Sequence, residues 1–152
     1  MNRYLLLDSG PLGLVTQPKQ SPEVVAMNRW LIERLSGGDA VVVPAIVYYE
    51  LRRELLRAGK TLGLARLDAF VQIDPSRYLA LTDEALRFAA ELWARARQQG
   101  RPTSPEFDLD VDVILAAQAL VFGAGADVIV ITTNPRHLRQ FLDARLWNDV
   151  GA

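Results

Sequence analysis

The sequence predicts a three-layer α/β fold with a mainly parallel central sheet, and three observations support this prediction. Strand-like and helix-like segments alternate along the whole chain, which is typical of parallel strands joined by helices. The strand-like segments are continuous apolar runs, as expected where helices cover both faces of a sheet. The chain has 152 residues, 50% of them hydrophobic and 23% charged, so we expect a single domain over residues 1–152.

The first half of the chain contains two predicted strands and three predicted helices. An apolar run at residues 4–7 predicts a strand, and the Asp-Ser-Gly-Pro sequence after it predicts a turn. A Ser-Pro-Glu start and a Gly-Gly end bound a helix at residues 21–36. A β-branched run between Asp and Pro predicts a buried strand at residues 40–43. Apolar side chains at helical spacing predict helices at residues 45–58 and 62–71.

The second half continues the alternation. Residues 78–81 predict a short strand, and a Thr-Asp-Glu cap begins a long helix at residues 82–99. Two prolines mark residues 100–107 as a loop, after which residues 111–122 predict a helix and residues 128–131 a third strong strand. Two further elements are predicted at the end of the chain: a helix at residues 136–142 and an edge strand at residues 146–150.

The composition excludes several kinds of chemistry. The absence of Cys excludes disulfides, thiolate zinc sites and a Cys nucleophile, and the single His137 excludes a multi-His metal centre. The net charge of −1 removes the simplest argument for nucleic-acid binding, although only Lys19 and Lys60 among the 17 basic residues are not Arg. The N-terminal apolar run stops at Asp8, too early for a signal peptide, and the longest uncharged apolar stretch is too short to span a membrane. We therefore expect a cytoplasmic location.

Polar residues follow the predicted strands, where sites form in folds of this kind. Asp8 and Ser9 follow the first strand, and Thr132 and Asn134 follow the strong late strand. Glu50 lies about two turns into the helix after the middle strand. Taken alone, Asp8 is explained by the turn, and Glu50 is as easily a solvated partner of a nearby Arg as a functional residue.

Three further carboxylates, Asp108, Asp110 and Asp112, occur within five residues. Stabilisation of a helix N-terminus explains Asp108 or Asp110, but it explains Asp112 less well because apolar residues surround it. An EF-hand starting at Asp108 is excluded, since Val113 and Ala119 stand where Gly and Glu are needed.

Three of these carboxylates, taken together, indicate a function more clearly than each does alone. Asp8, Glu50 and Asp112 come from three segments that one sheet edge can gather. Clustered carboxylates repel one another unless a cation offsets their charge, and ligand sets made only of oxygen favour Mg²⁺ or Mn²⁺. Such a site suits metal-assisted phosphodiester chemistry, which needs neither His nor Cys.

Four sequence blocks in order resemble the PIN-domain family, in particular the VapC-like ribonuclease toxins. The first is Leu-Leu-Leu-Asp-Ser-Gly-Pro-Leu at residues 5–12, and the second, at residues 43–53, is a helix with an internal Glu-Leu. The third is Asp-Val-Ile-Leu-Ala-Ala-Gln-Ala at residues 112–119, and the fourth is Ile-Thr-Thr-Asn-Pro-Arg-His-Leu at residues 131–138. Each block alone is weak, but together they extend from Tyr4 to about Phe141.

The resemblance implies a three-layer α/β/α PIN-like fold and a Mg²⁺- or Mn²⁺-dependent ribonuclease that hydrolyses RNA. It implies that Asp8, Glu50 and Asp112 bind the metal and that Asn134 completes the catalytic set, where many relatives carry a fourth acid. Ser9, Thr132 and Asp108 are expected to support the site, and Asp110 is not. For His137 we favour a structural or phosphate-contacting role over catalysis. The RNA backbone is expected to contact four arginines near the ends of the blocks: Arg52, Arg53, Arg136 and Arg139.

The main hypothesis is therefore a ribonuclease toxin, with a cognate antitoxin and a homodimer as partners implied by the resemblance. Its alternative is a PIN scaffold that binds nucleic acid or protein and has weak or no activity, as Asn134 suggests. A phospho-accepting receiver domain is disfavoured because no Lys follows a late strand. The apolar residues on the early helices fit either an interface or the core, and the core is the more common case: Trp30, Leu31, Leu64 and Leu67.

Overall fold

A five-stranded parallel sheet forms the centre of the molecule. The computed structural model describes residues 2–100, 106–123 and 126–152, without the side chains of residues 106–109. Within these residues the strand order is β3-β2-β1-β4-β5, and every neighbouring pair is parallel. The strands are β1 (Tyr4–Leu7), β2 (Ala40–Pro44), β3 (Tyr78–Leu79), β4 (Val128–Ile131) and β5 (Ala144–Arg145).

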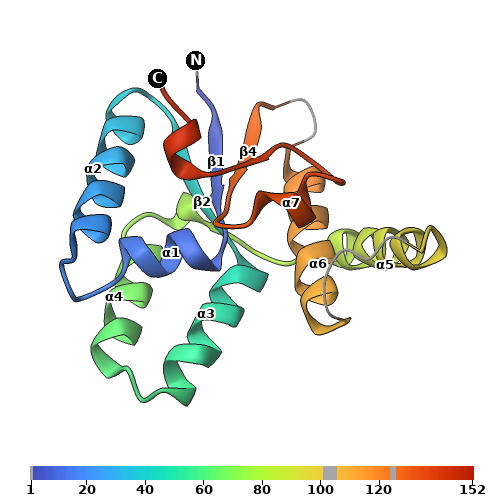
Figure 1. Cartoon of the computed structure of the whole chain (residues 1–152), viewed down its shortest axis with the longest axis horizontal. Helices are drawn as coiled ribbons and strands as arrows, with labels where there is room; N and C mark the ends of the chain where they lie inside the picture. Colours follow the sequence, from blue (N-terminus) through green and yellow to red (C-terminus); the bar gives the residue numbers. More distant parts are fainter. Residues whose placement is uncertain (1, 101–105, 124–125) are drawn as a thin grey trace.

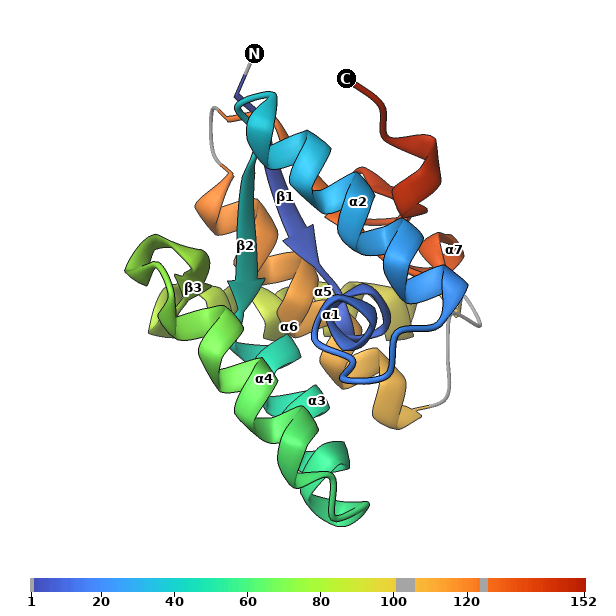
Figure 2. The ribbon, with the colours of Figure 1, turned by 90° about the vertical axis from the view of Figure 1, so that its left-hand side faces the viewer.

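Helices cover both faces of this sheet. They are α1 (Ser9–Val15), α2 (Pro22–Ser36), α3 (Ala45–Arg57), α4 (Thr61–Gln72), α5 (Asp83–Gln98), α6 (Glu106–Phe122) and α7 (Pro135–Leu138). Figures 1 and 2 show α1 and α2 on one face and α5 and α6 on the other, while α3 and α4 extend past the carboxyl ends of the strands. The predicted three-layer α/β/α fold is thus confirmed.

The core explains why the strands are continuous apolar runs. Leu5, Leu6 and Leu7 of β1 are fully buried, because β1 lies between β2 and β4 and has helices on both faces. Four apolar residues on the early helices fit either an interface or the core by sequence alone. Trp30, Leu31 and Leu67 are buried in this core, and Leu64 is half-buried. The core interpretation is therefore confirmed for these three residues.

The turn predicted after β1 is wrong, because helix α1 begins there at once. The Asp8 backbone is extended and its carboxylate accepts a hydrogen bond from the Ser9 N–H, so the residue works as an N-cap. Pro11 falls in the first turn, where its missing N–H costs no helical hydrogen bond.

Other differences concern the ends of elements. Helix α6 begins at Glu106 instead of residue 111, and β3 and α7 are shorter than predicted. The predicted strand at residues 146–150 is wrong: the edge strand is β5, and Trp147–Asp149 is a 3-10 helix. The tail leaves the sheet edge because it packs on α2, where the Trp30 and Trp147 rings meet at 6.0 Å and the Trp30 indole N–H donates to the Val150 carbonyl. Among the described residues, no helix is long and apolar enough to cross a membrane.

Candidate metal-binding active site

The candidate site is at the carboxyl ends of the central strands. Asp8 directly follows β1, and its N–H donates to the Ile131 carbonyl at the end of β4 over 2.8 Å. Because β1 and β4 are hydrogen-bonded neighbours, the residues that follow them meet at one edge of the sheet. This is the edge at which parallel α/β folds bind ligands.

The Asp8 carboxylate is held by two neutral donors. The Ser9 N–H donates to Oδ1 and the Thr132 hydroxyl donates to Oδ2, each over 2.8 Å. Burial raises the pKa of Asp8 above its ordinary value, and the two hydrogen bonds oppose this rise without cancelling it. The protein therefore orients this carboxylate but supplies it with neutral partners at short range.

Thr132 joins the two strand ends. Its side chain is buried, and its hydroxyl oxygen also accepts the Asn134 N–H over 3.2 Å. Gly10 permits the close approach of these segments, since a Cβ at this position would lie 2.7 Å from Cγ2 of Thr133. The predicted supporting roles of Ser9 and Thr132 thus correspond to contacts with Asp8.

The other two carboxylates come from helices. Glu50 is half-buried on α3, the helix that follows β2, and Asp112 is half-buried near the beginning of α6. The Nδ1 atom of His137 lies 3.9 Å from Oδ2 of Asp112, so the single histidine stands beside an acid of the site.

Gln118 is a residue of this region that sequence reasoning missed. Its buried amide accepts the Ile46 N–H at the start of α3 and donates to the Leu79 carbonyl at the end of β3. It therefore fixes α6, which carries Asp112, against the start of the helix that carries Glu50. A detectable signal was present in the sequence: Gln118 is a polar side chain within an apolar helical stretch.

One cavity of about 180 Å³ gathers the predicted residues. Six of the seven predicted catalytic and supporting residues line it: Asp8, Ser9, Glu50, Asp112, Thr132 and Asn134. His137 lines it as well. The seventh, Asp108, lies in α6 but outside the residues whose side chains are described.

The donor chemistry of this cavity fits Mg²⁺ or Mn²⁺, because carboxylate, amide and hydroxyl oxygens line it. In the described part of the chain, no three Asp, Glu or His side chains lie close enough to form a closed metal cluster. The carboxylates surround the cavity instead of meeting at one point. An ion there would keep water among its ligands, as Mg²⁺ usually does.

The four arginines predicted to contact RNA differ in their surroundings. Arg52 donates from Nη1 to both Asp68 oxygens, at 2.6 and 2.8 Å, and so fastens α4 to α3. Arg139 donates from Nε to the Ala144 carbonyl, and Arg136 is exposed on α7. The Arg53 guanidinium lies over the Tyr49 ring, 5.3 Å from its centroid.

Comparison with known proteins gives a match only at the level of structure. No protein-family model matches the sequence, and no curated protein matches it. Among solved structures, VapBC2 from Rickettsia felis bound to a DNA fragment from their promoter matches with a TM-score of 0.70 and 16% identity, over 95% of this chain and 98% of that one. The chain has the same fold.

Two further structures agree. FitAcB from Neisseria gonorrhoeae matches with a TM-score of 0.68 and 17% identity, over 96% of this chain and 99% of that one. VapBC-1 from nontypeable Haemophilus influenzae matches with a TM-score of 0.61 and 18% identity, over 95% and 98% of the two chains. The resemblance predicted from the four sequence blocks is therefore confirmed for the fold.

Proposed function

We propose that this protein is a metal-dependent endoribonuclease of the PIN type. The observation that carries the proposal is the single cavity that Asp8, Glu50 and Asp112, from three separate segments, line at the carboxyl edge of the sheet. Carboxylates gathered in this way favour a divalent cation, and the likeness in fold to VapBC structures agrees with the PIN resemblance of the sequence, which implies this chemistry.

Asp8, Glu50 and Asp112 would hold the Mg²⁺ or Mn²⁺ ion. When bound, such an ion activates water and offsets charge on a scissile phosphate. Thr132 and the Ser9 N–H keep the Asp8 carboxylate in one orientation. Asn134 contributes an amide at the rim of the cavity, where it can donate to a phosphate oxygen or accept from a water molecule.

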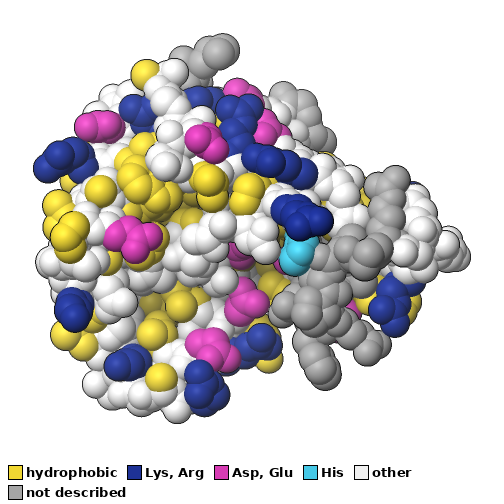
Figure 3. Space-filling model, viewed as in Figure 1, with side chains coloured by type: hydrophobic (Ala, Val, Ile, Leu, Met, Phe, Trp, Pro, Cys, Tyr) yellow, Lys and Arg dark blue, Asp and Glu magenta, His cyan; other side chains and the backbone are white. Residues whose placement is uncertain are grey.

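Exposed arginines give the RNA backbone a surface next to the cavity. Figure 3 shows Lys and Arg side chains in a line across the face of the molecule that leads to the single His. Arg136 on α7 and Arg139, which caps α7, are exposed close in sequence to His137 of the cavity, and Arg53 is exposed on α3. Guanidinium groups suit phosphate contacts. Positive charge gathered on this surface can therefore attract the RNA backbone although the net charge of the whole chain is near zero.

We further propose the role of a VapC-like toxin with an antitoxin partner. A groove of about 600 Å³ between α1, α3 and α4 adjoins the acidic cavity, because both include Gly10. Leu14, Leu51 and Leu55 line the groove together with both lysines of the chain. An apolar antitoxin segment with acidic residues would match this lining. Homodimerisation and a cytoplasmic location stay predictions.

The test is cleavage of single-stranded RNA by the purified protein with Mg²⁺ or Mn²⁺. We expect cleavage that EDTA stops and that Asp8→Asn reduces roughly hundredfold or more, since one ligand is lost. Asp143→Asn is the matched control, because this exposed residue pairs with Arg145 outside the cavity. Full metal-dependent activity of Asp8→Asn would refute the proposal.

The second candidate is a PIN scaffold without activity, favoured by Asn134 at the position of a fourth acid. Calorimetric titration with Mn²⁺ separates the two candidates. A nuclease should bind Mn²⁺ and lose binding in Asp112→Ala, whereas a scaffold should give little heat with either protein.

A further inference from the structure

Two adjacent tyrosines on α3 have different surroundings. The Tyr48 hydroxyl donates to Asp68 over 2.6 Å, and its ring meets the Tyr78 ring edge-on at 5.8 Å. Tyr48 is thereby fixed within the fold. The neighbouring Tyr49 is 56% exposed, and the Arg53 guanidinium lies over its ring, 5.3 Å from the ring centroid.

This exposed ring lies on the helix that supplies Glu50 to the acidic cavity. Tyr49 directly precedes Glu50, and Arg53 is four residues after Tyr49 and three after Glu50. Residues three or four positions apart are neighbours on a helix surface, about 5–6 Å apart, so Arg53 is a neighbour of both Tyr49 and Glu50. Arg53 therefore connects the exposed Tyr49 ring, over which it lies, to Glu50, which lines the cavity.

We propose that Tyr49 and Arg53 form a stacking surface for an unpaired base of single-stranded RNA, whose adjoining phosphate lies at the acidic cavity. The inference rests on the proposed ribonuclease function and adds a base-binding subsite to it. Proteins hold unpaired bases by stacking them on aromatic rings and on guanidinium planes. The positive charge of Arg53 also attracts the nearby phosphate backbone.

An exposed aliphatic residue on the same helix serves as the control. Leu56 is 57% exposed on α3, close to the value for Tyr49, but it offers no flat π surface. General apolar contact with RNA would involve both positions, whereas stacking involves Tyr49 alone.

The experiment measures the affinity of the full chain for a short single-stranded RNA that carries 2-aminopurine, with Ca²⁺ in place of Mg²⁺ and intact RNA verified on a gel. We expect Tyr49→Ala to weaken binding roughly five- to hundredfold and to abolish quenching of the 2-aminopurine. Tyr49→Phe should restore both, and Leu56→Ala should leave both unchanged. Since Tyr49 is exposed, the melting temperatures should agree with that of the wild type.

The outcomes separate the subsite from the function it rests on. If wild-type protein binds and cleaves RNA and Tyr49→Ala binds equally well, the stacking subsite is refuted and the ribonuclease proposal stands. If Leu56→Ala weakens binding as much as Tyr49→Ala, stacking is also refuted. If wild-type protein neither binds nor cleaves RNA with Mg²⁺ or Mn²⁺, the ribonuclease proposal fails and the subsite fails with it.

Discussion

Two aspartates at opposite ends of the sheet show how differently a folded chain can treat a carboxylate: Asp39 is buried and Asp8 is half-buried. Asp39 precedes β2 at the amino end and receives hydrogen bonds from the Arg3 guanidinium at 2.7 and 3.1 Å. Asp8 follows β1 at the carboxyl end and receives hydrogen bonds from a backbone N–H and a hydroxyl. The pKa of Asp39 is lowered, chiefly by Arg3, whereas burial raises the pKa of Asp8.

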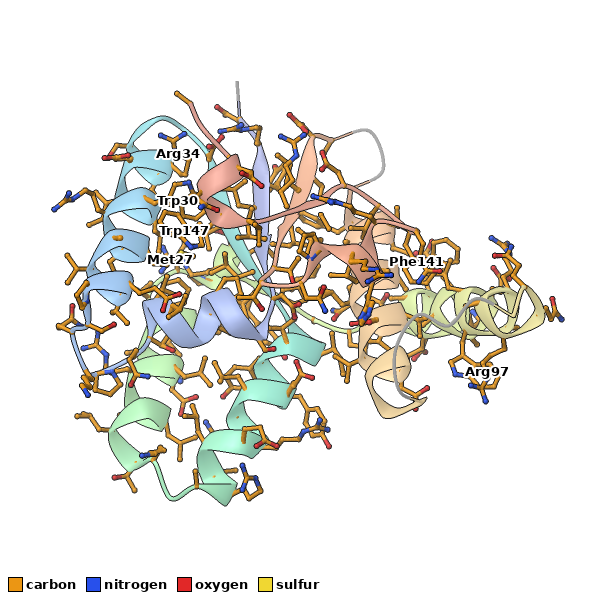
Figure 4. The ribbon with its side chains drawn as sticks, viewed as in Figure 1. Met27, Trp30, Arg34, Arg97, Phe141 and Trp147 are labelled. Carbon is orange, nitrogen blue, oxygen red and sulfur yellow. The ribbon has the colours of Figure 1, made fainter. Side chains whose placement is uncertain are left out.

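The difference supports the proposal that the carboxyl end of the sheet is the functional end. At the amino end the protein supplies its own cation, and the C-terminal segment packs nearby against α2. Figure 4 shows Trp30, Arg34 and Trp147 gathered there between α2 and this segment. At the carboxyl end Asp8 has neutral donors and shares a cavity with Glu50 and Asp112. A carboxylate placed in this way gains most from a cation that comes from outside.

The largest expected effect on stability is at the amino end. Asp39→Asn leaves Arg3 enclosed without its counter-charge, and breaking such a pair costs about 3 kcal/mol. Asp8→Asn should leave stability in EDTA unchanged or higher, because it removes a half-buried charge and Asn is an equally good N-cap. Urea denaturation measures both free energies of unfolding. Equal losses of unfolding free energy in the two variants would contradict the comparison. The control is Asp143→Asn, which removes an exposed ion pair with Arg145 and should lower the free energy of unfolding by less than about 1 kcal/mol.

The next effect is stabilisation by metal. A ligand that binds only the folded state at about 100 times its Kd adds roughly 2.7 kcal/mol to the free energy of unfolding. We expect Mn²⁺ to raise the Tm of the wild type and of Asp39→Asn, but not that of Asp8→Asn. Thermal unfolding with and without EDTA provides the measurement. A rise in Asp8→Asn as large as in the wild type would place the metal elsewhere.

A smaller effect is the pH dependence in metal-free buffer, at most about 1.4 kcal/mol per pH unit for one group. The pKa of Asp8 is raised on folding, so its contribution is full below the ordinary value of 3.8 and is lost as pH rises through the folded value. The pKa of Asp39 is lowered, so its contribution is present above 3.8 and is lost as pH falls through the folded value. Stability measured from pH 3 to pH 8 in Asp8→Asn and Asp39→Asn should therefore deviate from the wild type in opposite directions.

The smallest effect concerns the hydroxyl that orients Asp8. Thr132→Val keeps the side-chain shape but removes the hydrogen bonds to Asp8 and Asn134, at a cost of about 1 kcal/mol. Thr133→Val is the matched control, because Thr133 also lines the cavity but is exposed. Metal affinity should fall in Thr132→Val and stay unchanged in Thr133→Val. Equal metal affinity in both variants would show that orientation by Thr132 is unimportant.

Much of the fold was predictable because strong local patterns define its central elements. The apolar runs of β1, β2 and β4 are unbroken, and α2 and α5 are preceded by the N-caps Ser21 and Thr82, whose hydroxyls accept N–H groups of the first turn. Of the two elements predicted wrongly, only the C-terminal tail depends on a contact distant in the sequence, since Asp8 caps α1 locally. Trp30 draws the tail away from the sheet edge, and α1 begins where its local sequence is typical of a turn.

For the candidate site, too, the residues could be predicted from local sequence patterns, but the contacts between them could not. The sequence named most residues that line the acidic cavity, because polar side chains after apolar strands stand out. It could not reveal that Thr132 donates to Asp8, that Arg52 is engaged by Asp68, or that Gln118 connects α6 to α3 and β3. Each of these contacts joins residues at least 16 positions apart.

By itself, the sequence determined the alternation of strands and helices and the acidic residue types available for chemistry, since both depend on local pattern and composition. Only the tertiary structure decided which carboxylate received an arginine and which was left with neutral donors. The parallel sheet places the end of β1 beside the end of β4 and the start of β1 beside the start of β2. Through this pairing Asp39 meets Arg3 and Asp8 meets Thr132, so the pKa values of two chemically identical side chains shift in opposite directions.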